Sequence, residues 1–317
     1  MFRRGVIACG FAGAARAQDR PVRMVVPSQA GGTTDSFARR VAVRMQPPLG
    51  QPVTVVNRPG EGGSIGTLEV IRARPDGQTI LLSTASTLCL HGMLTEPPRF
   101  DVFADLVPIS LLGASPVVFA VRSGGASGLA ELLDAARHQS PGLRFGSPGT
   151  GTYLHLALEM LRRQAGEPPF AHVPFVGSSL TLAGLLAGQV DAITATVANS
   201  LRPHRAGDIH ILAVAGARRS PLLPEVPTVA EALSLAEFEA ALWMTLMLPA
   251  GGPVTMRDRL AYAINSTLSD RSLRVELEQT GFEVGGLLSP AAITGFLRAE
   301  QARWRPLLQA VSRARAK

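Results

Sequence analysis

Four short segments rich in glycine, serine and threonine could bind an anion, because each precedes a helical run and three of them follow a strand-like one. They are residues 31–35, 83–87, 147–152 and 173–179. Glycine exposes backbone N–H groups, hydroxyls add donors, and a helix start carries unpaired N–H groups with about half a positive charge. Ligands of α/β proteins bind at the carboxyl ends of strands, where such turns meet. The segments therefore predict one cleft of amide and hydroxyl donors, which suits a carboxylate without a buried lysine or arginine.

The first segment, G-G-T-T-D at residues 31–35, also raises the alternative of a nucleotide site. A dinucleotide fingerprint needs G-x-G-x-x-G and a P-loop needs G-K-[ST], and the segment has neither. Lys317 is the only lysine in the chain, which also excludes lysine Schiff bases and Ser-Lys dyads. Asp35 is open to two roles, since it could contact the ligand or cap the helix and bond its first amides. Residues 147–152 could likewise be a plain loop with a helix N-cap.

Signatures of catalysis and of metal binding are weak in this sequence. The G-x-S-x-G elbow is absent, since Ser147 lies in F-G-S-P-G. The six histidines show neither H-x-x-x-H nor H-E-x-x-H spacing. His155 and Glu159 lie four apart on a predicted helix, but without a third ligand nearby a helix-face pair is favoured over a metal site. We therefore expect no metal, no cofactor and no catalysis, while His155 could form a wall of the pocket.

The elements that position these segments alternate between strands and helices. Strand-like runs occur at residues 22–26, 53–56, 80–83, 117–121, 143–146, 192–196, 211–215 and 243–248, with apolar stripes at helical spacing between them. This alternation predicts an α/β fold with mostly parallel sheets. The loops near residues 31 and 149 echo each other, which predicts two lobes facing one cleft. We place the crossings near Val118 and Leu242, so that lobe 1 holds residues 18–118 and 243–317 and lobe 2 holds residues 119–242.

The first 17 residues have the pattern of an export signal. Arg3 and Arg4 precede a stretch of small apolar residues, and an A-x-A cleavage site ends at Ala17. The alternatives are an ordinary N-terminal helix or a lipid anchor at Cys9. We expect a periplasmic protein, cleaved after Ala17, whose formal charge falls from +7 to +4 because three arginines leave. Its single remaining cysteine excludes an intrachain disulfide, and no apolar run reaches membrane-spanning length. Weak positive charge and 5% aromatic residues argue against nucleic acid.

Motifs along nearly the whole chain resemble the Bug/TctC family, the extracytoplasmic solute-binding subunits of tripartite tricarboxylate transporters. The motifs are P-x-x-A-G-G-T-T-D (27–35), L-G-Q-P-V-x-V-x-N-R-P-G-x-G-G-x-I-G (49–66), P-D-G-x-T (75–79), S-P-G-T-G-T-x-x-H (147–155), V-P-F-x-G-S (173–178), L-L-A-G-Q-V-D (185–191), R-R-S-P-L-L-P-E-V-P-T-V-A-E (218–231) and L-P-A-G-G-P (248–253). Their shared order and spacing make the resemblance specific.

The resemblance implies a type II periplasmic-binding-protein fold, with a central sheet in each of two lobes that close on a ligand. It implies a carboxylate held by the first Gly-Thr loop and by residues 147–152, often through water. Carried onto this sequence, the ligand-binding residues are Gly31, Gly32, Thr33, Ser147, Gly149, Thr150, Gly151 and Thr152, with Thr84, Ser86, Gly177, Ser178 and Thr196 more loosely implied. Asp191 matches the G-Q-V-D motif, where it could contact the ligand or fix the start of the next strand.

Two departures from the family pattern bear on specificity. The family often has an aromatic residue after the first motif proline, where this chain has Ser28 and then Gln29. It often has Tyr-Lys in the V-P-Y-K-G segment, where this chain has Phe175 and Val176. If Val176 borders the pocket, a second carboxylate would lack a charge partner and an apolar group would be better tolerated. A monocarboxylate or an aromatic acid is then as consistent with the sequence as a tricarboxylate.

Together these features predict a periplasmic solute-binding protein that captures a small organic acid by lobe closure. We expect a monomer that delivers the acid to integral membrane transporter subunits. An alternative is a receptor that presents the bound acid to a sensor kinase. An exported enzyme is a third reading, for which the sequence offers no catalytic motif.

Overall fold

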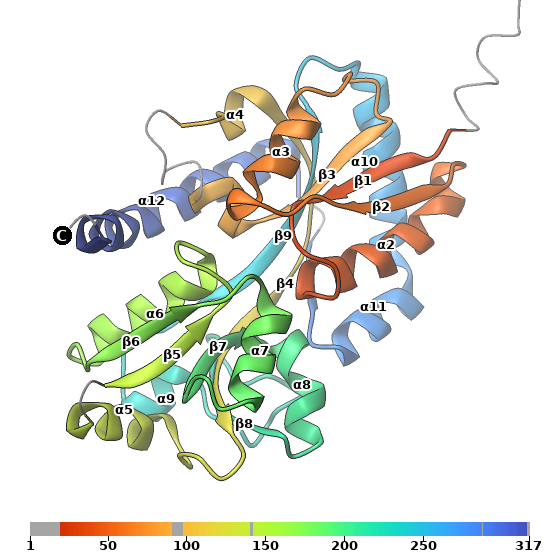
Figure 1. The fold of residues 1–317 in the computed structure, drawn as a ribbon. Coiled ribbons are helices and arrows are strands. Elements are labelled where there is room, and N and C mark those ends of the chain that lie inside the picture. The colour runs from red at the N-terminus through yellow and green to blue at the C-terminus, as the bar shows by residue number, and fades with distance from the viewer. Residues whose placement is uncertain (1–19, 91–97, 140–141, 287, 316–317) are drawn as a thin grey trace, which may run out of the picture.

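The computed structural model describes residues 20–90, 98–139, 142–286 and 288–315, which Figure 1 shows as two lobes. The expected signal peptide lies outside the described residues. The strands are β1 (Val22–Val26), β2 (Val53–Asn57), β3 (Thr79–Thr84), β4 (Leu106–Arg122), β5 (Leu143–Ser147), β6 (Phe170–Pro174), β7 (Ala192–Thr196), β8 (Ile209–Ala215), β9 (Ala241–Pro249) and β10 (Glu283–Val284). The helices are α2 (Thr33–Leu49), α3 (Ser64–Ile71), α4 (Val102–Asp105), α5 (Leu129–His138), α6 (Tyr153–Gln164), α7 (Ser178–Leu186), α8 (Val197–Arg205), α9 (Val229–Leu233), α10 (Val254–Ser269), α11 (Arg271–Gln279) and α12 (Pro290–Arg315), with a 3₁₀ turn η1 (Glu61–Gly63) and a π turn η2 (Ser86–Leu90).

The first lobe is built on three parallel strands in the order β2-β1-β3. Alternate residues of β1 face opposite layers, as the period of a strand requires. Met24 packs with the apolar faces of α2, α10 and α11, whereas Val25 joins the core that includes α3 and α12. The helices thus cover both faces of the sheet. The ends of the strands and the loops that follow them are left uncovered by these helices.

The second lobe repeats this plan with the parallel order β7-β5-β6. Phe145 of β5 packs edge-on against Phe119 of β4, with ring centroids 6.2 Å apart, in the core that includes α5 and α6. On the other face, Leu185 of α7 and Leu201 of α8 pack over Ile193 of β7. The loops after β5 and β6 therefore project from this sheet as those after β1 and β3 project from the first.

Two long strands, β4 and β9, join the two sheets and make the whole sheet mixed. They pair antiparallel with each other from Leu106 to Pro116 of β4. From Val117 onward β4 pairs antiparallel with β7 and β8 of the second lobe. The parallel pairing predicted from the sequence is found within β2-β1-β3 and within β7-β5-β6. Every antiparallel pair includes β4 or β9, and their antiparallel partners are β3, β7, β8 and β10. The change of partners on β4 lies beside Val118.

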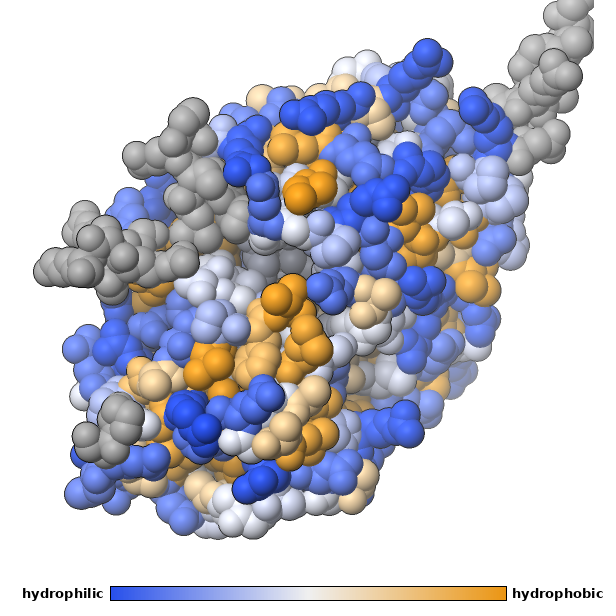
Figure 2. Space-filling model, viewed as in Figure 1, coloured by the Kyte–Doolittle hydropathy of each residue, from blue (hydrophilic) through white to orange (hydrophobic). Residues whose placement is uncertain are grey.

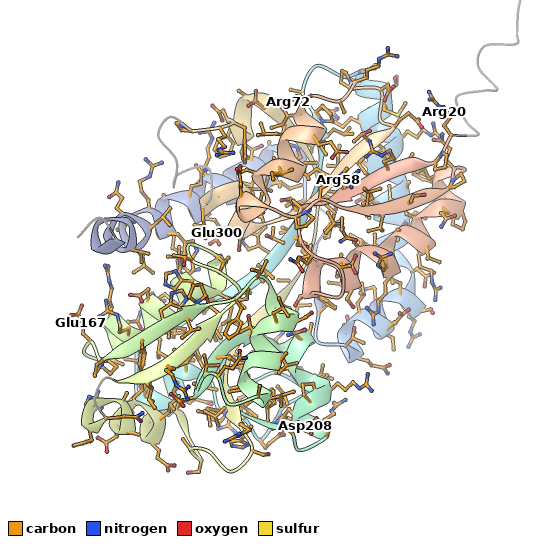
Figure 3. All side chains as sticks on the ribbon, viewed as in Figure 1. Arg20, Arg58, Arg72, Glu167, Asp208 and Glu300 are labelled. Atoms are coloured by element: carbon orange, nitrogen blue, oxygen red, sulfur yellow. The ribbon has the colours of Figure 1, made fainter. Side chains whose placement is uncertain are left out.

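The long helix α12 packs along the junction of the lobes, against η2, β4 and α6 (Figure 1). Its buried Glu300 accepts hydrogen bonds from both tryptophans of the chain, through Oε2 at 2.9 Å from Trp243 Nε1 and 3.2 Å from Trp304 Nε1 (Figure 3). Trp304 also packs edge-on against Tyr153 at the start of α6, with ring centroids 4.7 Å apart. This cluster connects α12 to a crossing strand and to a helix that begins at the cleft.

Candidate functional site

A cleft of about 320 Å³ lies between the two lobes, and Figure 2 shows the surface hollowed there. Five loops line it: those from β1 to α2, β2 to α3, β3 to η2, β5 to α6 and β6 to α7. The sequence predicted four of these loops. The fifth, around residues 59–63, lies in a quoted motif but was not assigned to the site. The donor-rich turns of both lobes are thus brought to one space.

The residues expected at the site divide into two groups. Those that line the cleft are Ser28, Gln29, Gly32, Thr33, Thr84, Ser86, Gly149, Thr150, Thr152, Val176, Gly177 and Ser178. Those outside its lining are Gly31, Asp35, Ser147, Gly151, His155, Asp191 and Thr196. The contacts of the second group show what each does instead.

Asp35 braces the first loop from beneath. It is 3% exposed, and its carboxylate accepts hydrogen bonds from the Gly31 amide at 2.9 Å, from Arg39 Nε at 3.0 Å and from Asn57 Nδ2 at 3.0 Å. Burial alone would raise its pKa, but the hydrogen bonds from Arg39, Gly31 and Asn57 hold the pKa of Asp35 below its usual value. Of its two expected roles, bracing is the one that these contacts support. The Gly31 amide, already bonded to Asp35, is not a donor left for a ligand.

Three helices begin at the cleft with a glycine N-cap and no capping side chain. They are α2 at Gly32, α3 at Gly63 and α7 at Gly177, and each glycine lines the cleft. The first-turn N–H groups of a helix have no acceptor within that helix. The positive ends of the three helix dipoles lie at the same space, which makes it favourable for negative charge.

The second loop, from β5 to α6, is braced by Ser147 and His155. Ser147 Oγ hydrogen bonds with His172 Nε2 at 2.7 Å and accepts the Gly149 amide at 3.3 Å. His155 Nδ1 accepts the Gly151 amide at 3.0 Å, and its ring stacks on that of His172, with centroids 3.9 Å apart. Ser147, Gly151 and His155 therefore lie outside the cleft lining, and their hydrogen bonds support the shape of the loop.

Two threonines of this second loop line the cleft, and they differ in their hydrogen bonds to the rest of the protein. Thr152 caps α6, because its Oγ1 accepts the His155 amide at 3.3 Å, and it donates to the Gly149 carbonyl at 2.7 Å. Thr150 makes no hydrogen bond to another residue in the described ranges through its amide or its hydroxyl. Thr150 is therefore the donor of this loop that remains open to a ligand.

Direct hydrogen bonds join the lobes across the cleft. The buried hydroxyls of Thr33 and Thr196 lie 3.0 Å apart, Ser179 Oγ donates to the Gly31 carbonyl at 3.1 Å, and the Tyr153 amide donates to Ser86 Oγ at 2.9 Å. Thr196 also caps α8. Thr196 and Gly31 thus lie at direct contacts between the two lobes, beside the cleft rather than in its lining.

Asp191 lies at the opposite end of its strand from the cleft. It precedes β7 and forms an ion pair with Arg144, with Oδ1 2.6 Å from Arg144 NH2 and Oδ2 accepting the Arg144 amide at 2.8 Å. Burial raises its pKa, and the hydrogen bonds from Arg144 more than offset this and lower the pKa. It lies outside the cleft lining, and its contacts fit the alternative, in which it fixes the start of the strand.

Charge is sparse in the cleft. Among the described residues that line it, Glu61 is the only charged one, and its carboxylate is paired with Arg99. Apolar side chains make up much of the remaining wall, namely Leu154, Phe175, Val176, Leu180 and Leu242, with Pro27, Pro59 and Pro148. Sequence reasoning missed most of these side chains. Their only signal was position, because Leu154 and Leu180 lie within two residues of predicted loops that line the cleft.

Groups that would indicate other functions are not found in the described part of the chain. No three side chains among His, Cys, Asp and Glu gather there as a metal site. Within the same residues, no helix combines the length and the apolar character needed to cross a membrane.

Comparisons with known proteins agree on one family. The sequence model of the tripartite tricarboxylate transporter family receptor matches residues 37–312. Protein BugT of Bordetella pertussis is 33% identical over 287 residues, which cover 90% of this chain and 87% of that protein. The structure of Rpa4515 of R. palustris with adipate superposes with a TM-score of 0.87 at 31% identity, covering 92% of this chain and 97% of that one. MatC of Rhodopseudomonas palustris with bound malate gives a TM-score of 0.84 at 28% identity, covering 91% and 99%.

Proposed function

The chain belongs to the tripartite tricarboxylate transporter family of receptors, and we propose that it captures a small carboxylate-bearing organic acid and delivers it to a membrane transporter. It is a periplasmic solute-binding protein of this family, which is a family of receptors rather than enzymes. We propose three properties beyond membership of the family, namely that the ligand carries a carboxylate, that it is passed to a transporter and that it is not chemically altered. Relatives that hold adipate and malate support the first of these.

The observation that carries the proposal is the convergence of three helix starts without a capping side chain, at Gly32, Gly63 and Gly177, on a cleft whose described lining residues include no cation. Hydrogen bonds to an ionised acceptor are stronger than those between neutral groups, so backbone amides and hydroxyls can hold a carboxylate without a counter-ion. The donors that remain after internal bonding include the first-turn amides of α2 on one lobe and, on the other, the first-turn amides of α7 together with Thr150. A carboxylate that contacts both sets would draw the lobes together.

Closure of the lobes is the mechanism that this arrangement supports. We propose that the two lobes meet where β4 and β9 pass from one sheet to the other, and that these strands act as the hinge. Lobe 1 then holds residues 18–118 and 243–317, and lobe 2 holds residues 119–242. A ligand favours the closed form only by the free energy of contacts it makes in that form alone. Bonds such as Thr33 to Thr196 add to the closed form, and the ligand supplies the remainder by bridging the loops.

A ligand panel tests the proposal. Ligand-free protein is heated with mono-, di- and tricarboxylates, and with the amide of each acid as its neutral control. An acid present at about 100 times its Kd should raise the free energy of unfolding by about 2.7 kcal/mol, and its amide should not. Mass spectrometry of the recovered acid should show it unchanged. The proposal fails if no carboxylate raises the melting temperature above its amide, and the absence of catalysis fails if the acid returns altered.

A further inference from the structure

Building on the proposed function, we propose that the cleft selects acids with a single carboxylate on an apolar chain or ring over dicarboxylates of the same length. The two solved relatives hold adipate and malate, both of which are dicarboxylates. The inference therefore sets this chain apart from those relatives, and it concerns the part of the cleft that lies away from the carboxylate donors.

Apolar side chains line part of the cleft from its buried end to its opening. Leu154 and Leu242 are 3% and 6% exposed and form part of the floor. Val176 and Leu180 are 66% and 50% exposed on the second lobe, and Figure 2 shows hydrophobic surface beside the opening there. An apolar chain or ring placed between them would remove apolar area of both partners from water, which is favourable. A carboxylate in the same place would lose hydration and gain little in return.

The position of Val176 is fixed rather than adaptable. The amides on either side of it are anchored to the second loop, Phe175 to the Ser147 carbonyl at 2.8 Å and Gly177 to the Pro148 carbonyl at 3.1 Å. The ring of Phe175 lies so close to Gly184 that a Cβ there would meet its Cζ at 2.4 Å. A valine side chain at the mouth is therefore a built feature of the wall, held by the same loop that offers Thr150.

A second carboxylate would find no available cation among the described residues near the mouth. Arg99 is paired with Glu61, the lining residue whose own charge would repel an anion. Arg58, in the loop that follows β2 (Figure 3), donates from Nε to Glu69 Oε2 at 2.9 Å. The other Glu69 oxygen bonds Arg23. Each guanidinium is thus committed to an acid, and recruiting it would break an existing ion pair.

The size of the cleft agrees with a small acid. Its volume of about 320 Å³ is at the lower end of the range for small-molecule pockets, roughly 300–1,000 Å³. A terminal methyl group keeps the carbon of a terminal carboxylate and lacks only its two oxygens, so chain length does not separate the two classes. Charge and hydration do, and this makes matched pairs of acids the informative probes.

The test compares acids that differ only by a terminal methyl in place of a carboxylate, by titration calorimetry at a pH where all carboxyl groups are ionised. Hexanoate is paired with adipate, and 4-methylbenzoate with terephthalate. We expect the monocarboxylate of a pair to bind at least about tenfold tighter. In Val176→Lys, which places an ammonium at the mouth, this ratio should fall at least about fivefold, mainly through tighter binding of the dicarboxylate.

Two controls make the outcome decisive. Val43→Lys adds the same charge at a valine that is 62% exposed on α2 and outside the cleft lining, and it should leave the ratio unchanged. Val176→Met lengthens the side chain without charge and should preserve the preference. Dicarboxylates that bind as tightly as their partners, or a ratio that Val176→Lys does not lower, would overturn the inference while leaving carboxylate capture intact. If no carboxylate of either class binds, the proposed function fails with it.

Discussion

Replacing Asp35 by asparagine should lower the free energy of unfolding by about 3 kcal/mol and weaken ligand binding as well. Oδ2 of Asp35 accepts from Gly31 and Arg39, while Oδ1 accepts from Asn57 and lies 3.0 Å from Arg39 NH2. Asparagine keeps the shape but has one oxygen, so in either orientation its NH2 group faces two donors. A lost hydrogen bond to a carboxylate costs about 1.5–3 kcal/mol, and the donor left unpaired adds about 1 kcal/mol. The weakened ion pair with Arg39 contributes little to this loss of unfolding free energy, because the Arg39 side chain is 53% exposed.

The effect of Asp35→Asn should also depend on pH. The folded-state pKa of Asp35 lies below its usual value of 3.8. Its ionised form therefore stabilises the fold fully at pH values above 3.8, and this contribution is lost as the pH falls through the lower folded pKa. The difference in unfolding free energy between wild type and Asp35→Asn should be constant near neutral pH and shrink in acid.

Urea denaturation of the ligand-free protein measures the stability, and titration calorimetry measures the affinity. Asp270→Asn is the matched control, because Asp270 caps α11 through the Ser272 and Leu273 amides and asparagine caps helices equally well. Its effect should stay below about 0.5 kcal/mol. The bracing argument is refuted if Asp35→Asn behaves like this control. It is also refuted if Asp35→Asn loses stability and still binds the acid with unchanged affinity, since the loop would then not depend on its brace.

Three further substitutions probe the loops, the closed form and the strand brace. Thr150→Val removes an open hydroxyl and should weaken binding by about 1 kcal/mol in calorimetry, whereas unchanged affinity would remove Thr150 from the ligand contacts. Thr33→Val removes the buried hydrogen bond to Thr196 between the lobes and should weaken ligand binding about fivefold. Thr33→Ser keeps the hydroxyl and should bind like wild type. Equal affinities for the two variants would contradict a role of this hydrogen bond in binding. Asp191→Asn should lower stability by about 1 kcal/mol, measured in urea, through its weakened pair with Arg144, and a change in Kd beyond about threefold would restore it as a ligand contact.

The sequence predicted the loops well, because their composition and place between strand and helix are local properties. The resemblance to the receptor family and the two-lobe fold are confirmed by the family match and by the solved relatives. The strand β6 was missed, since Phe170–Pro174 has no fully buried residue and no continuous apolar run. Only part of β4 was predicted, because Pro108, Gly113 and Pro116 interrupt its pattern.

The sequence did not predict which residues of each loop line the cleft and which support the loop from behind. Asp35 and Thr33 are two residues apart, yet one braces the loop from beneath and the other meets the opposite lobe. Their roles follow from the direction of each side chain at the helix start, which only the assembled lobes reveal. Asp191 shares its motif with buried neighbours but lies at the wrong end of β7 for a ligand. Glu61 and Gly63 belong to a short 3₁₀ turn that composition alone does not assign to the cleft.

The two tryptophans bonded to Glu300 can report on ligand binding through their intrinsic fluorescence. Both tryptophans donate to one carboxylate oxygen, and Trp304 packs on Tyr153, whose amide bonds Ser86 across the cleft. Any movement of α6 against α12 therefore changes the surroundings of the indoles together. Intrinsic fluorescence should follow ligand capture in a stopped-flow experiment without an added dye, and Glu300→Gln, which leaves the cleft lining untouched, should alter the emission at rest.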